Sequence, residues 1–146
     1  MSAEGAGWVR TARLERAAGR WRVTTAEQGN LDSALRAAGK PLAGLPGTED
    51  PHRLDRAADL DLGAAPLFNT LPIRRLGLLA AAPGTAETVT VVWMRVPSLE
   101  VLPARQTYTA LGGGRVRFAS ETFTADLAVD GDGYVTHYPG LASLAD

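Results

Sequence analysis

Apolar and polar residues alternate with a period of two along much of the C-terminal part of the chain. Residues 89–94 are apolar at nearly every position, which predicts a strand covered on both faces. Residues 123–129 alternate strictly, which is typical of a half-buried antiparallel strand. Shorter alternating runs occupy residues 106–111, 115–118 and 134–138. The pattern therefore predicts a series of neighbouring β-strands.

Glycine-rich sequences separate these predicted strands. Three glycines at 112–114 and the Asp-Gly-Asp-Gly sequence at 130–133 supply turns, because glycine tolerates a positive φ angle. Pro97 and Pro103 limit strand pairing and suit a sheet edge or a bulge. The strands are therefore predicted to pair antiparallel in chain order. Their buried side chains are expected to include Phe123, Leu127 and Val129.

The N-terminal half carries weaker strand patterns. Apolar residues share one face at 8–14, and a second strand begins at 21–23. Alternating leucines and aspartates at 59–62 indicate a third, short strand, which places both aspartates on one face.

Two short helices are predicted between these strands. Residues 31–38 form two turns with Asn30 as the N-cap, and a Pro- and Gly-rich loop follows at 39–53. Residues 70–76 form the second helix, with Asn69 as its N-cap. The apolar side chains expected to face the sheet are Leu71 and Leu76.

The composition narrows the possible classes of function. The chain has 146 residues, 45% of them hydrophobic, which we interpret as a single domain spanning residues 1–146. Its net charge of −1 gives no overall field that would attract nucleic acid. Cysteine is absent, which excludes disulfides and thiolate metal sites and fits the reducing cytoplasm. No apolar run approaches the roughly 18 residues of a membrane span.

The Arg74-Arg75 pair has two interpretations. Arginine forks match phosphate or sulfate oxygens, so the pair would suit an anionic headgroup. Consecutive helical residues point about 100° apart, however, so the two side chains cannot easily hold one ligand. The alternative is a structural role, in which the arginines pair with Asp59 or Asp61.

Candidate catalytic and metal-binding groups are sparse. Asp59 and Asp61 would be the paired carboxylates of a hydrolase, with His137 as a third group. A solvated face, or ion pairs with the two arginines, explains the same aspartates. The sequence at 130–133 lacks the further acidic ligands of a calcium loop. We therefore predict no catalytic residue, no metal site and no cofactor.

Several segments match one known family in chain order. They are FNTLPIRRLGL (68–78), VVWMRVPSLEVLPARQTYTAL (91–111), RVRFAS (115–120) and FTADLAVDGDGYVTHYPGL (123–141), with weaker matches in DLDL (59–62) and GWVRTARLE (7–15). In these motifs the chain resembles a bacterial family of glycolipid-binding proteins with a spiral β-roll fold. The resemblance covers residues 54–141 well.

The resemblance implies a mainly β fold, in which a curved antiparallel sheet wraps around a short central helix at about 70–76. It also implies a homodimer that binds a glycolipid or another amphipathic lipid without catalysis. Family members carry further strands before the segment matching Gly7–Glu15, so we expect an N-terminally shortened roll whose sheet begins with an unpaired edge at Trp8. The alternative is a structural or interaction protein, a dimer with a filled core and no ligand.

A lipid cavity in such a roll would be lined by aromatic and apolar side chains, with a polar rim. The arginines at 74 and 75 would supply that rim. The residues predicted to contact a ligand are Leu71, Arg74, Arg75, Trp93, Tyr108, Phe123 and Tyr138.

Overall fold

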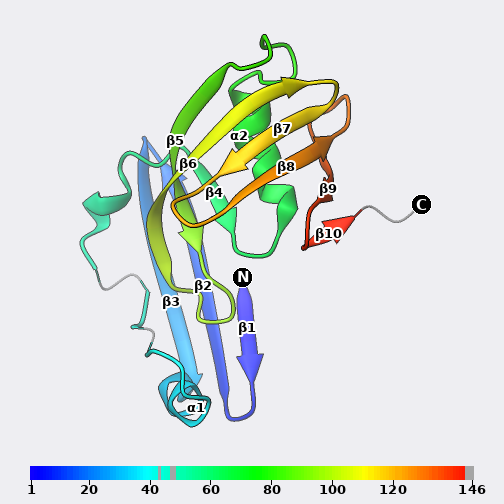
Figure 1. Cartoon of the computed structure of the whole chain (residues 1–146). Helices are drawn as coiled ribbons and strands as arrows, with labels where there is room; N and C mark the ends of the chain where they lie inside the picture. The colour runs from blue at the N-terminus through cyan, green and yellow to red at the C-terminus, as the bar shows by residue number, and fades with distance from the viewer. Residues whose placement is uncertain (43, 47–48, 144–146) are drawn as a thin grey trace.

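The structure is a computed structural model that describes residues 1–42, 44–46 and 49–143. It contains two β-sheets and four short helices (Figure 1). The strands are β1 (Ser2–Gly5), β2 (Trp8–Ala17), β3 (Arg20–Gly29), β4 (Asp59–Leu62), β5 (Ala86–Met94), β6 (Val101–Gly112), β7 (Arg115–Ala119), β8 (Thr124–Val129), β9 (Val135–Tyr138) and β10 (Ala142–Ser143). The helices are α1 (Leu31–Ala37), η1 (Pro51–Leu54), η2 (Pro66–Asn69) and α2 (Thr70–Arg75).

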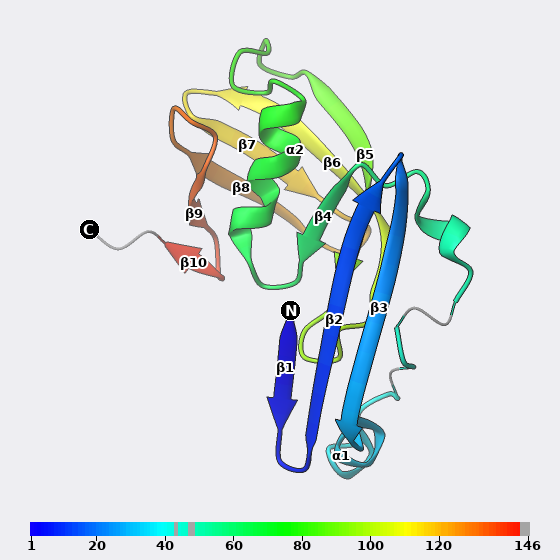
Figure 2. The same cartoon turned by 180° about the vertical axis from the view of Figure 1, so that it is seen from behind.

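The larger sheet has seven strands in the order β10-β9-β8-β7-β6-β5-β4. Strands β5 to β10 are antiparallel neighbours in chain order, as the alternation and the glycine turns predict. The sheet curls into a half-barrel, and α2 lies against its concave side (Figure 2). The predicted mainly β fold, a curved sheet around a short helix, is therefore confirmed. Strand β4 is an exception to the expected antiparallel order, because it pairs parallel with β5.

The second sheet has three antiparallel strands in the order β1-β2-β3. Strand β1 precedes the predicted start of the sheet and pairs along β2, with Gly5 opposite Trp8. The expectation that the strand at Trp8 has an unpaired edge is therefore wrong, because β1 and β3 flank it. Helix α1 follows β3, and Asn30 caps it by accepting a hydrogen bond from the Ser33 amide at 2.9 Å, as predicted.

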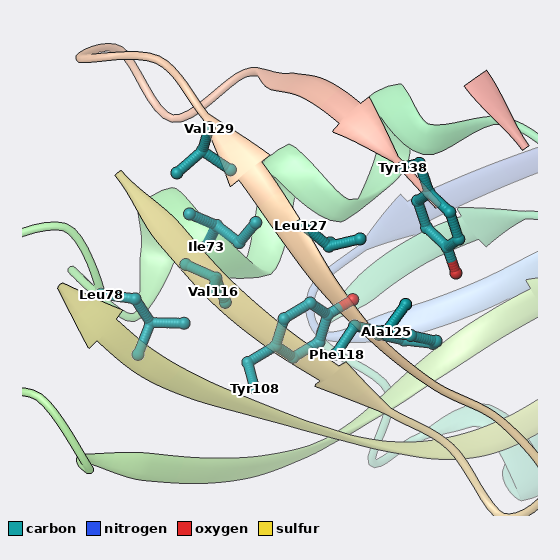
Figure 3. Packing of buried hydrophobic residues seen from close by; sticks show 9 residues of the cluster. All are labelled: Ile73, Leu78, Tyr108, Val116, Phe118, Ala125, Leu127, Val129 and Tyr138. Carbon is teal, nitrogen blue, oxygen red and sulfur yellow. The ribbon is translucent and has the colours of Figure 1, made fainter. Parts of the chain in front are cut away.

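Two apolar clusters hold these layers together. The inner core lies between α2 and the concave face of the larger sheet, where Ile73 of α2 is fully buried among sheet residues (Figure 3). The second cluster joins the convex side of β5 to the three-stranded sheet, through residues such as Ala12, Val92 and Met94. The inner core comprises Ile73, Leu78, Tyr108, Val116, Phe118, Ala125, Leu127, Val129 and Tyr138.

Arg10 is a buried charge at the junction between the two sheets. Only 2% of Arg10 is exposed, because it lies on the same buried face of β2 as Trp8 and Ala12. Its Nε donates to Glu27 at 2.7 Å, and its Nη1 donates to the carbonyl of Ser98 at 2.7 Å. A buried guanidinium requires such partners, since an unpaired charge in the interior is costly. The link therefore ties the loop between β5 and β6 to the smaller sheet.

Three details of the predicted elements are wrong. Asn69 makes no capping hydrogen bond, because η2 runs directly into α2 and Asn69 is itself helical, with φ −64° and ψ −23°. Leu71 is 45% exposed, and Ile73 faces the sheet in its place. Phe123 is also 45% exposed, because β8 begins only at Thr124 and Phe123 belongs to the preceding turn.

The predicted loop at 39–53 includes residues 43, 47 and 48, which lie outside the described residues. In the described part of this segment, η1 begins at Pro51, and the Asp50 carboxylate accepts a hydrogen bond from the His52 amide at 2.9 Å. The earlier residues of the segment that the structure describes contain no strand or helix.

Strand β6 is paired unevenly along its length. Residues Val101 to Thr109 pair with β5, but the pairing of β6 with β7 begins only at Thr107. Residues 102–106 therefore have a strand on one side only. Pro103 lies in this half, as expected for a residue that cannot donate a ladder hydrogen bond. The sheet is thus open beside the first half of β6.

Candidate ligand-binding groove

A groove of about 990 Å³ occupies the opening beside the first half of β6. One side is formed by β4, the segment that follows it and η2, including Asp61 and Pro66. The opposite side is formed by the turn between β7 and β8, including Ser120 and Phe123. Tyr138 of β9, Leu141, and residues of β5 and β6 such as Trp93 also line the groove. The groove exists because β7 ends while β6 continues, so no strand fills the space.

A chain of buried hydrogen bonds lies at the inner side of the groove. The Asn69 side-chain Nδ2 donates to the Tyr108 hydroxyl at 2.9 Å, and that hydroxyl donates to Gln106 Oε1 at 2.9 Å. The Gln106 side-chain Nε2 then donates to Asp61 Oδ2 at 2.5 Å. The direction is fixed by Asp61, because an ionised carboxylate only accepts hydrogen bonds. Gln106 must therefore present its amide nitrogen to Asp61 and its oxygen to Tyr108.

The hydrogen-bond chain ends on Asp61, which keeps an acceptor oxygen available to a ligand. Asp61 Oδ1 accepts no hydrogen bond from the residues that the structure describes, and the half-buried Asp61 side chain lines the groove. Burial raises the pKa of the Asp61 carboxyl above its ordinary value, and the hydrogen bond from Gln106 opposes that rise. Asp61 is therefore a partly desolvated acceptor whose free oxygen would gain from a donor on a ligand.

Two tyrosine hydroxyls are affected by the same environment. Burial raises the pKa of Tyr108 far above its ordinary value, while the hydrogen bond from Asn69 opposes the rise. Burial also raises the pKa of Tyr138, and the negative charge of Asp61 adds to the effect. Both hydroxyls are therefore neutral at physiological pH.

An aromatic wall forms the other part of the lining. Phe118 packs edge-on against Tyr108, with ring centroids 5.5 Å apart and planes at 61°. Phe123 and Tyr138 lie nearly parallel, with centroids 6.0 Å apart and planes at 9°. Phe118 and Tyr138 are buried, whereas the 45% exposure of Phe123 leaves its ring available in the groove. The wall therefore presents a flat apolar surface whose position is fixed by the inner core.

The lining carries charges of both signs. Among the described lining residues, Asp61 and Glu121 are acidic, and Arg95 and Arg105 are basic. The Arg95 guanidinium stacks over Trp93 at 4.7 Å and forms an ion pair with Glu100. Because Glu100 neutralises Arg95, only Arg105 remains to offset the two acidic lining residues, so the lining offers no excess of positive charge for an anionic ligand.

The predicted site residues fall into two groups. Trp93, Phe123 and Tyr138 line the groove, and Tyr108 lies directly behind the lining in the hydrogen-bond chain. The remaining three residues, Leu71, Arg74 and Arg75, are not among the described lining residues.

Both arginines of α2 have partners in the protein. Arg75 binds Asp59 with both Nε and Nη2, at 3.0 and 2.7 Å from Oδ2, as the structural interpretation of this pair expects. The guanidinium of Arg74 lies over the ring of Tyr134 at 5.7 Å. The hydrogen bond to Asp59 raises the pKa of Arg75 above its ordinary value.

Sequence reasoning missed Asn69 and Gln106 as site residues. The sequence pattern favours Asn69 as a helix cap, but its side chain donates to the hydroxyl of Tyr108 on β6. Gln106 gives a usable signal, because it is a polar residue on the inward face of a strand that is otherwise apolar there. The prediction that Asp59 and Asp61 lie on one face of their strand is correct. Both side chains accept hydrogen bonds from groups on the concave side of the sheet.

The groups considered for hydrolysis are not brought together. Asp59 is engaged by Arg75, Asp61 by Gln106, and His137 is exposed with its Nδ1 2.8 Å from the Ser143 hydroxyl. Within residues 1–42, 44–46 and 49–143, no three His, Asp or Glu side chains gather closely enough to ligate a metal ion. In the same part of the chain, no helix has both the length and the apolar character needed to cross a membrane.

The fold and groove define a mainly β half-barrel that surrounds a helix and has a ligand-sized opening beside it. The family described as "Putative glycolipid-binding" matches residues 1–143, so the chain belongs to that family. The crystal structure of a DUF1089 family protein from Pseudomonas aeruginosa is similar, with a TM-score of 0.60 and 26% sequence identity. The match covers 93% of this chain and 77% of that one. None of the curated proteins compared with the chain matches it.

Proposed function

We propose that this protein binds a glycolipid, or a related amphipathic lipid, in the groove and does no chemistry on it. The description of the family supports a glycolipid as the ligand. The observation that carries the proposal is the groove itself, which combines a polar inner side at Asp61 and Gln106 with an aromatic wall at Phe123 and Tyr138. An amphipathic molecule has the same division into a polar and an apolar part.

The volume of the groove is consistent with this ligand. Small-molecule sites commonly measure about 300 to 1,000 Å³, and this groove lies at the upper end with about 990 Å³. A headgroup and part of an alkyl chain would fit, while the rest of the chain would leave through the open side. The space between α2 and the sheet is filled by the inner core, so the ligand would lie in this groove and not inside the roll.

The surroundings of the polar groups support binding without catalysis. Asp61 is the acceptor at the end of a hydrogen-bond chain, and no described nucleophile or base contacts its free oxygen. His137 bonds to Ser143 near the C-terminal end of the described residues. The cysteine-free sequence supports a protein that acts in the reducing cytoplasm.

Native mass spectrometry of the purified protein tests the proposal. We expect an adduct whose mass corresponds to a lipid, and organic extraction should release it for identification. Phe123→Ala should lower the adduct fraction, because it removes the exposed ring from the groove. Tyr134→Ala is the matched control, since Tyr134 is 43% exposed and is not among the described lining residues. No adduct on the purified protein, together with no binding of an added alkyl glycoside, would exclude the proposed function.

A further inference from the structure

We propose that the groove binds the ammonium group of an amphipathic amine, with the Asp61 carboxylate as its counter-ion and the aromatic wall as its second contact. This inference rests on the proposed function, because it assigns a charge to the polar end of the same ligand. It is carried by a half-buried carboxylate that lacks a cation, by the position of the two lining arginines and by the exposed aromatic ring.

Asp61 differs from two other carboxylates that the fold removes from solvent. Asp59 pairs with Arg75, and Glu27 pairs with Arg10. Among the residues that the structure describes, Asp61 has no such arginine, because its Oδ2 accepts only from a neutral side-chain amide and its Oδ1 accepts nothing. A charge that is withdrawn from water is normally compensated by an opposite charge. The cation that Asp61 lacks is therefore what a ligand can supply.

The two arginines of the lining do not fill this role. Arg95 is held by Glu100 at 3.1 Å and lies over a tryptophan ring. Arg105 directly precedes Gln106 in β6, and successive side chains of a strand point to opposite faces. Gln106 turns inward to bond Asp61, so the Arg105 side chain starts on the outer face, where it is exposed. The inner end of the groove therefore keeps its negative charge.

The titratable groups on neighbouring strands add no positive charge. Burial raises the pKa of the Tyr108 and Tyr138 hydroxyls, so both are neutral at physiological pH. The negative charge of Asp61 acts on the Tyr138 hydroxyl, which bonds to no described residue. A primary ammonium group has three N–H donors. Asp61 Oδ1 and the Tyr138 oxygen are both acceptors available to it.

The aromatic wall supplies the second contact. A cation is attracted to the face of an aromatic ring within about 6 Å of its centroid. The Phe123 ring is 45% exposed in the groove and lies nearly parallel to Tyr138, with centroids 6.0 Å apart. The guanidinium of Arg95 already lies over Trp93 in this manner, at 4.7 Å. The exposed ring therefore favours an ammonium group and the methylene groups next to it.

Four probes separate the parts of this inference. Octyl glucoside and octyl glucosaminide differ in one group, which is a hydroxyl in the first and an ammonium in the second. Octylammonium has the charged group and the alkyl chain without a sugar, and ethylammonium lacks both the sugar and the long chain. Each is titrated below its micelle concentration into delipidated, ¹⁵N-labelled protein at about pH 6.5, below the usual pKa of such amines. The side-chain amide signal of Gln106 reports on the inner end of the groove, because that amide bonds to Asp61.

We expect octyl glucosaminide to bind about ten-fold more tightly than octyl glucoside, since a hydrogen bond between charged groups is worth at least a factor of about ten. Asp61→Asn should remove this preference, and asparagine keeps an oxygen for the Gln106 amide. Glu121→Gln is the matched control, because it removes the same charge from an exposed position of the lining and should leave the preference unchanged. Thermal melts of both variants confirm that they are folded.

A second variant tests the aromatic contact independently. Phe123→Leu keeps an apolar side chain but removes the ring face, so it should lower the affinity for octylammonium about three-fold. Tyr134→Leu is the matched control at a similarly exposed ring outside the described lining. Unchanged octylammonium affinity in Phe123→Leu would overturn the aromatic contact.

The outcomes separate this inference from the proposed function. Equal affinity for octyl glucoside and octyl glucosaminide, or a preference that survives Asp61→Asn, would overturn the ammonium subsite and leave lipid binding intact. The tighter of octyl glucosaminide and octylammonium identifies the source of the group, an amino sugar or a long-chain amine, and either result supports the subsite. Ethylammonium binding as tightly as octylammonium would keep the subsite and overturn the lipid function. If no probe binds, both proposals are wrong.

Discussion

Removing the hydroxyl of Tyr108 tests whether the buried hydrogen-bond chain behind the groove is real. The Tyr108 side chain is fully buried, and its hydroxyl both accepts from Asn69 and donates to Gln106. Tyr108→Phe keeps the ring and its packing against Phe118 but leaves two buried polar groups without a partner. An unsatisfied buried group costs about 1 to 3 kcal/mol, so we expect a loss of about 3 kcal/mol of unfolding free energy.

This loss converts into a measurable change in melting temperature. Unfolding entropy is about 2.1 cal/mol/K per residue, which for 146 residues amounts to about 0.3 kcal/mol/K. A loss of about 3 kcal/mol therefore lowers Tm by about 10 °C. The matched control is Tyr134→Phe, at an exposed tyrosine, which should stay within about 0.5 kcal/mol of the original protein.

A double-mutant cycle gives the sharper form of this test. Asn69→Leu in the Tyr108→Phe background removes the donor that the first substitution left unpaired. The double variant should therefore lose about 1 kcal/mol less than the sum of the two single variants. Thermal and urea melts measure all three variants. Additive losses, or a Tyr108→Phe variant as stable as Tyr134→Phe, would show that the hydroxyl does not connect these side chains.

Three further predictions concern the ion pairs, the titration of the groove and the oligomeric state. Arg75→Met should cost about 2 kcal/mol in a urea melt, because it leaves the buried Asp59 without its two-pronged partner, whereas Arg117→Met at an exposed pair should leave the melt unchanged. Burial raises the pKa of Asp61 above 3.8 in the folded protein. Between 3.8 and this raised pKa, the folded chain therefore binds more protons than the unfolded chain. The free energy of unfolding consequently falls as pH rises through that window. Asp61→Asn has no carboxyl to titrate, so its Tm should rise relative to that of the original protein between pH 4 and 7. A Tm difference that does not change with pH would contradict the raised pKa of Asp61. Light scattering after size exclusion should give twice the chain mass of 15.4 kDa, as the family resemblance implies; a monomeric protein would refute this prediction.

The sheet was largely predictable because its signal is local. Val116, Phe118 and Leu127 occupy alternating positions between glycine turns, and all three are buried as the pattern indicates. The parallel pairing of β4 with β5 was not predictable in the same way, since it joins segments separated by α2 and the pattern of a strand does not specify its neighbour. Phe123 shows where the alternation pattern fails to predict burial. The alternation extends to Phe123, but the paired strand begins only at Thr124.

The groove was harder to predict because its polar contacts connect distant segments. Asn69 is a residue type that commonly caps helices. Only the folded chain brings it to Tyr108, which lies 39 residues later in the sequence. Gln106 and Asp61 are 45 residues apart and meet because β4 and β6 both flank β5. The aromatic residues Trp93, Phe123 and Tyr138 were within reach, since bulky rings on predicted strands are few in this chain. What the pattern could not supply was the early end of β7, which opens the groove.

The half-paired state of β6 has a consequence for the behaviour of the protein in solution. Residues 102–106 present strand backbone to the groove, and such backbone can recruit a strand from another molecule. Pro103 removes one donor from this segment, and the hydrogen bond from Arg53 to the Val101 carbonyl occupies its start. A bound ligand would cover the rest. Emptying the groove should therefore make the protein aggregate faster, so that solubility on storage reports ligand occupancy.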